Sequence, residues 1–205
     1  RLMTRPDITV TKTAGGLGRR QPSQDMISGL VMNGKAVSGG AQLDTPYKLR
    51  STKQAEDLGL TDSYDDNESL LVHYHIKEFF RMNPSGVLWL MLVAQTANSN
   101  PLTTDKIVDK SNDYAKKLLV EANGEIRQLG VAMNPGSGYS ASATNGIDTT
   151  VENAIPKAQA LVDEELTKHR PVDVILEGRK LGVASGALDL RSQSAQNVSV
   201  IVAQD

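Results

Sequence analysis

Two glycine-rich stretches carry residue types that could do chemistry. Residues 15–20 (GGLGRR) have the glycines and cations of a phosphate-binding loop, but they lack its Lys-Ser/Thr pair and follow no strong strand pattern. Residues 136–140 (GSGYS) place serines among glycines, yet the glycines do not flank either serine as they do in a nucleophile elbow. Neither stretch therefore predicts a nucleotide site or a hydrolase.

The three histidines are candidates for catalysis or metal binding. His73 and His75 are two residues apart in a helical pattern, so their side chains diverge by about 200° and cannot hold one metal from the same face. The helical wheel puts His75 in an apolar stripe beside Phe79, which predicts a hydrogen-bonded core histidine, and it puts His73 at the boundary of that stripe. His169 falls in the last turn of a predicted helix, where the helix dipole favours a cation. These patterns favour structural roles for all three.

The acidic group Asp62, Asp65, Asp66 and Glu68 could suggest a hard cation, but it lacks the glycine and the spacing of a calcium loop. Charge complementarity at a helix N-terminus explains Asp65, Asp66 and Glu68 better. The chain has no cysteine, which excludes disulfides and thiolate metal sites. The sequence thus predicts no catalytic, cofactor-binding or metal-binding residue.

Composition limits the classes of molecule that could be partners of the protein. The 205 residues are 39% hydrophobic, enough for one good core, and the net charge of −2 gives no electrostatic case for nucleic acid. The longest apolar run, Val87–Ala94, is too short to span a bilayer, and no signal-peptide pattern opens the chain. We expect neither nucleic acid nor membrane as a partner.

The elements that would position any site centre on residues 67–95. The pattern predicts a helix capped by Asn67, a stop at Asn83-Pro84-Ser85-Gly86, and a strand that is apolar at every position of Val87–Ala94. A strand with no polar face must be covered on both sides, as in a parallel sheet.

The rest of the chain alternates between strand and helix patterns. Further strands are predicted at 26–32, 47–50, 126–133, 172–176 and 198–203, and further helices at 52–58, 105–122 and 148–169. This alternation predicts an α/β fold with a mostly parallel sheet flanked by helices on both faces. The residues divide into a flexible N-terminal arm, 1–25, and a core domain, 26–205.

The arm contains one strand-like segment, formed by Asp7, Ile8, Thr9, Val10 and Thr11. Burying its two apolar side chains would contribute roughly 3–6 kcal/mol, whereas fixing five backbone residues costs about 5–10 kcal/mol. We therefore expect the segment to stay loose alone and to become a strand on the sheet edge of another subunit. The glycines Gly15, Gly16 and Gly18 would act as its hinge.

Several runs resemble contractile-tail sheath proteins of phages and related injection machines. The resemblance spans most of residues 26–205. It rests on SGLVMNG (28–34), on YKLRSTKQAEDLGL (47–60) with its Ser51, Ala55, Glu56, Leu58 and Gly59, on residues 72–95, and on IRQLGVAMNP (126–135) and PVDVILEGRKL (171–181). These are patterns of a fold and not a chemical signature.

This resemblance implies a self-assembling, non-enzymatic structural protein without cofactors. Its partners would be neighbouring copies of itself and an inner tail tube protein. It would be cytoplasmic during assembly and then part of a virion tail or a phage-tail-like particle. Sheath proteins usually continue into a C-terminal domain, which the chain would lack. Two alternatives remain open: an α/β enzyme with its site in the loop 134–147, and a non-catalytic adaptor module.

Overall fold

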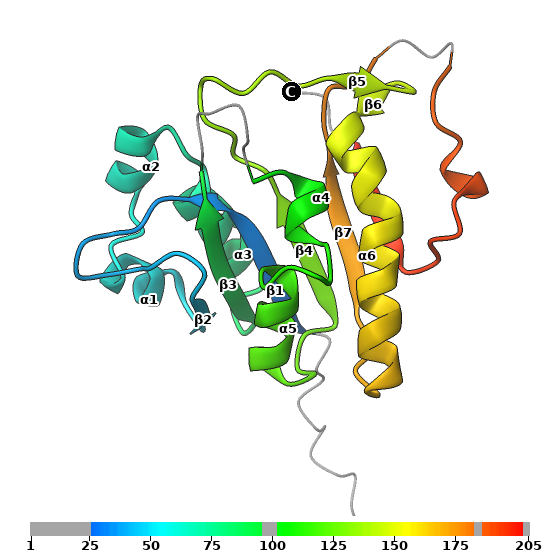
Figure 1. Cartoon of the computed structure of the whole chain (residues 1–205). Coiled ribbons are helices and arrows are strands. Elements are labelled where there is room, and N and C mark those ends of the chain that lie inside the picture. The colour runs from blue at the N-terminus through cyan, green and yellow to red at the C-terminus, as the bar shows by residue number, and fades with distance from the viewer. Residues whose placement is uncertain (1–25, 96–101, 183–185, 203–205) are drawn as a thin grey trace, which may run out of the picture.

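The computed structural model describes residues 26–95, 102–182 and 186–202, which form a six-stranded sheet between two layers of helices (Figure 1). The sheet order is β2-β3-β1-β4-β7-β8, and all neighbours are parallel except β2 and β3. The strands are β1 (Ile27–Gly34), β2 (Pro46–Leu49), β3 (Val87–Ala94), β4 (Gln128–Ala132), β7 (Asp173–Gly178) and β8 (Val198–Val202). A separate hairpin joins β5 (Ala143–Thr144) to β6 (Ile147–Asp148). The predicted fold class is confirmed.

The apolar strand β3 lies inside the sheet, as its composition predicts. Leu88, Leu90 and Leu92 pack into the core on one face, and Trp89, Met91 and Val93 into the core on the other. Both cores therefore depend on the same strand.

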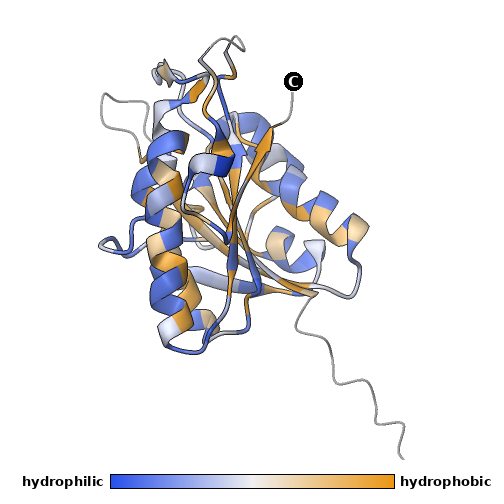
Figure 2. Ribbon diagram, turned by 90° about the vertical axis from the view of Figure 1, so that its right-hand side faces the viewer, coloured by the Kyte–Doolittle hydropathy of each residue, from blue (hydrophilic) through white to orange (hydrophobic). Residues whose placement is uncertain are grey.

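Helices cover the two faces unequally. One face carries α1 (Thr52–Asp57), α2 (Asp62–Glu68) and α3 (Val72–Met82), and the other carries α4 (Thr104–Ile107), α5 (Ala115–Ala122) and α6 (Thr149–Thr167). Figure 2 shows the helices on either side of the sheet, with apolar residues concentrated along the strands and on the helix surfaces beside them.

The strand order explains the unequal cover. The chain steps in one direction from β1 to β3, and in the opposite direction from β3 to β4, β7 and β8. Because parallel crossovers are right-handed, the first step puts its helices on one face and the later steps put theirs on the other. The α1–α3 face of β4, β7 and β8 consequently has no helix above it within the described residues.

Two predicted helices are interrupted in the structure. The predicted 67–82 helix begins only at Val72, because Ser69 adopts a left-handed conformation (φ 54°) at the end of α2, where Asn67 lies. The predicted 105–122 helix is divided into two helices, α4 and α5. Between them, Ser111 N donates to the Asp109 carboxylate (2.9 Å) and the Asn112 amide donates to Lys106 O (3.0 Å). Such local bonds compete with helix formation.

Candidate functional site

The carboxyl ends of the parallel strands, where ligands usually bind in such sheets, are tied together by Asn33. Its side chain is 2% exposed and donates to Ala94 O (3.1 Å) and Leu102 O (3.0 Å). Its side-chain oxygen Oδ1 accepts a hydrogen bond from Asn134 N (3.1 Å). The Asn33 side-chain amide therefore joins the end of β1 to three other points of the chain, at Ala94, Leu102 and Asn134. Its role is structural.

The 134–147 segment is also held by internal bonds. Asp148 is fully buried and accepts from Thr150 N (2.8 Å) and from the Tyr139 hydroxyl (3.2 Å). Burial, and then the nearby Asp148 charge, raise the pKa of Tyr139. Glu177 accepts from Met133 N at 2.9 Å. Within the segment that sequence reasoning kept open as an enzyme site, Tyr139 is thus bonded to the buried Asp148, and the β5–β6 hairpin forms the end of the segment.

His73 and His75 differ in burial in the opposite sense from the sequence prediction. His73 is the buried one, 2% exposed, with Nδ1 2.8 Å from Asp62 Oδ1 and Nε2 3.5 Å from Glu56 Oε1. His75 is only partly buried and faces a surface groove. His169 lies just past the end of α6 in a left-handed conformation (φ 59°). The core-histidine prediction for His75 is thus wrong, because α3 turns His73 toward α1 and α2.

The acidic group divides into separate roles. Asp62 binds His73, and the buried Asp65 accepts from His73 N (3.1 Å) and Tyr74 N (2.9 Å), so it caps α3 from the preceding helix. Glu68 pairs with Lys35. In residues 26–95, 102–182 and 186–202, no group of three or more His, Cys, Asp or Glu side chains could hold a metal ion.

The predicted arm residues, Asp7 to Thr11, and the hinge glycines Gly15, Gly16 and Gly18 lie outside the described residues. Two surfaces that could bind such an arm lie within the described residues. One is the outer edge of β8, which pairs only with β7 among the described strands. Ile201 and Val202 on this strand are each 57% exposed.

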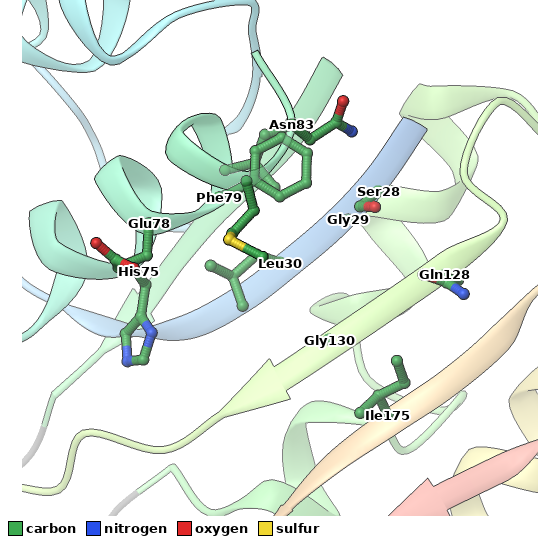
Figure 3. Close-up of a pocket in the computed structure, with 12 residues that line it drawn as sticks. Ser28, Gly29, Leu30, His75, Glu78, Phe79, Asn83, Gln128, Gly130 and Ile175 are labelled. Carbon is green, nitrogen blue, oxygen red and sulfur yellow. The ribbon is translucent and has the colours of Figure 1, made fainter. Parts of the chain in front are cut away.

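The second surface is a groove between α3 and the uncovered strands, here called the α3 groove (Figure 3). Its wall is the α3 side chains His75 and Phe79, and its floor is Leu30 of β1, Gly130 of β4 and Ile175 of β7. It holds a cavity of about 530 Å³, and a second of about 310 Å³ shares these residues except Phe79.

Sequence reasoning missed the α3 groove because its floor joins three strands whose order the sequence does not reveal. One signal could have pointed to it. Gly130 interrupts an otherwise regular strand, and a strand glycine often marks a place where another backbone or a ligand approaches closely.

Comparisons with known proteins give a family and a distant structural likeness. A model of the family described as DUF2586, N-terminal domain, matches residues 5–205. No curated protein matches the chain significantly. Among solved structures, the contracted helical sheath of the anti-feeding prophage, determined by cryo-EM, is 15% identical with a TM-score of 0.45. That alignment covers 93% of this chain and 45% of the other, so the chain spans less than half of that protein. None of the described helices is long and apolar enough to cross a bilayer.

Proposed function

We propose that this chain, which belongs to the DUF2586 N-terminal domain family, is a self-assembling structural subunit of the contractile-sheath type. In this proposal, copies of the protein assemble with one another around the inner tube of a phage tail or a phage-tail-like injection machine. Its role is to hold neighbours together while their packing changes, and it transforms no substrate.

The open edge of β8 is the observation that carries the proposal. An unpaired edge strand presents a row of free N–H and C=O groups, and monomeric proteins usually blunt it with lysine, proline or a bulge. Val198–Val202 contains neither lysine nor proline, and its Ile201 and Val202 side chains are largely exposed. Such an edge favours pairing with a strand from another chain.

The N-terminal arm is the strand that we assign to this edge. Asp7–Thr11 would pair along β8 of a neighbouring subunit, gaining main-chain hydrogen bonds and cover for Ile8 and Val10. The hinge glycines Gly15, Gly16 and Gly18 would let the arm cross without straining its own domain. The internal bonding of Asn33, Asp148 and Glu177 supports a structural role for the strand ends.

Electron microscopy of the full-length protein made in cells tests the proposal. We expect rings or tubes from the intact chain and none from a variant that lacks residues 1–24, whose domain should remain folded by circular dichroism. Ordered tubes from the deletion variant would rule out the arm as the link. A monodisperse monomer that turns over a substrate would favour an enzyme.

A proline in β8 tests the edge itself. Val174 N donates to Asn197 O (2.9 Å), so Asn197 and Ser199 direct their backbone groups toward β7, and Val200 directs its own outward. Val200→Pro removes an outward N–H and should abolish assembly while the β7–β8 ladder persists. Val200→Thr keeps the N–H and a similar shape, so it should assemble normally. Assembly by the folded proline variant would exclude pairing at this edge.

A further inference from the structure

We propose that the α3 groove holds the subunit's own N-terminal arm before assembly, with Asp7–Thr11 lying extended along the groove floor. This goes beyond the proposed function, on which it rests only for the arm's later transfer to a neighbour. It also replaces the expectation that Asp7–Thr11 stays loose alone, because the groove offers cover for Ile8 and Val10 within the same subunit. The arm then has two binding sites: the α3 groove of its own subunit and the β8 edge of the next.

The shape of the α3 groove supports an extended occupant. Its floor follows β4, where Gly130 lies beside Leu30 on one side and Ile175 on the other (Figure 3). A Cβ at Gly130 would make ordinary contacts, 3.5 Å from Leu30 Cδ1 and 3.6 Å from Gly29 O. The interior therefore does not require glycine there, although a strand glycine costs stability. Its absent side chain instead leaves room for another backbone.

Beside the polar His75 and Glu78, the groove wall carries apolar side chains where a solvent-facing helix surface would be polar. On α3, Val72, Ile76 and Phe80 already face the sheet, yet Phe79 and Met82 also line the groove. Met82 is 73% exposed. A helix with apolar residues on a second side favours a partner on that side.

The arm segment matches the floor in length and periodicity. Five extended residues span roughly 17 Å, which is also the span of the five residues of β4. Ile8 and Val10 are two apart, so they point to one side with a spacing of about 7 Å, the spacing between Gly130 and Ala132. Pro6 and the β-branched run Ile8–Thr11 both favour an extended backbone.

The point where the arm joins the domain favours its own subunit as the source. The arm precedes β1, and Ser28, the second residue of that strand, lines the groove. Residues 12–25 can span up to about 46 Å, far more than the groove length. A tether of this length gives an effective concentration of order mM, so the subunit's own arm outcompetes arms of other copies at micromolar protein.

Charge favours the same contact. Residues 1–25 hold five of the 22 Lys and Arg residues and two of the 24 Asp and Glu residues, so the arm is net +3 and the remainder net −5. Arg5 and Lys12 flank the strand-like segment. Glu78 and Glu177, which line the groove, keep 35% and 42% of their side chains exposed beside their own arginine partners. The arm and the domain that carries the groove therefore have net charges of opposite sign.

Paramagnetic relaxation tests this inference cleanly, because the chain has no cysteine. A spin label on Thr4→Cys should remove most of the intensity from the Gly130, Ile175 and Phe79 amide signals in the folded full chain, at a concentration at which sedimentation shows the protein to be a monomer. A mixture of spin-labelled unenriched protein with unlabelled ¹⁵N protein should show no such loss, because the contact is within one molecule.

Two sets of variants show that the contact is specific. Ile8→Ser with Val10→Ser removes the apolar side of the segment and should restore the signals, whereas Thr9→Ser with Thr11→Ser alters the other side and should leave the loss intact. Gly130→Val fills the floor and should restore the signals too. In the assembling chain, it should also shorten the lag before tubes form, since the arm is released.

Full intensity of the groove amide signals in the chain that carries both the spin label and ¹⁵N would overturn the inference. Equal loss in the mixture would overturn it too. Restoration by the threonine variants would overturn it as well. Failure of the intact chain to form tubes would contradict the proposed function alone, because the relaxation experiment does not depend on assembly.

Discussion

The imidazole Nδ1 of His73 lies 2.8 Å from Asp62 Oδ1 and joins α3 to α2 through a ring that is 3% exposed. His73→Ala should lower the free energy of unfolding by about 1–3 kcal/mol, because it deletes a buried ring, leaves a cavity between the helices and removes the bond to the exposed Asp62. Urea unfolding measures the change. The control is His75→Ala, which removes a partly exposed ring and should cost clearly less. Equal losses would mean that His73 does not hold the helices together.

Asp65 is expected to matter through the backbone of α3. Its carboxylate accepts from His73 N and Tyr74 N, two of the free amides in the first turn. Asp65→Ala should cost about 1–2 kcal/mol, as loss of a helix cap does. Its exposed neighbour Asp66→Ala should change stability little. Chemical denaturation of both variants compares them, and matching values would exclude the capping role.

The two phenylalanines should differ although their rings touch, with centroids 5.1 Å apart. Phe80 is 8% exposed within the core, whereas Phe79 is only partly buried at the groove. Phe80→Ala should cost about 3–5 kcal/mol because it leaves a cavity. Phe79→Ala should cost less, which thermal and urea melts can show. A larger loss at Phe79 would contradict this packing.

Glu164 should make stability depend on pH in the acid range. Hydrogen bonds from Lys168 (2.9 Å) and Lys116 (3.0 Å) lower the pKa of Glu164 to about 2. Because this pKa is lower in the folded state, the stabilisation is complete above the unfolded pKa near 4.5 and is lost as pH falls toward 2.

Glu164→Gln should therefore be less stable than the parent at pH 7, with a difference that shrinks between pH 4.5 and 2. Unfolding free energies measured across that range provide the test, with the exposed Glu121→Gln as the control. A difference that stays constant with pH would mean that the lysine contacts do not depend on the carboxylate charge.

Sequence patterns predicted those elements whose burial follows from their own residues. The run Val87–Ala94 is apolar throughout and does lie between two cores. The same patterns failed where partners distant in sequence decide. Asp65 caps α3 from another helix, so the predicted 67–82 helix begins only at Val72 and His73 faces inward. The insertion of β1 between β3 and β4, and with it the α3 groove, depends on sheet order. No local pattern encodes that order.

The strand order also has a consequence for synthesis on the ribosome. β3 joins one side of β1, β4 joins the other, and β7 and β8 then add in turn at the same growing end. Only β2 must wait, because it emerges before β3, the strand with which it pairs. No strand has to insert between two that are already paired, so β1, β3, β4, β7 and β8 can join the sheet in the order in which they emerge. β4 and β7 each join with one side unpaired, which the next strand then takes, and β8, the last strand described, presents the same unpaired side.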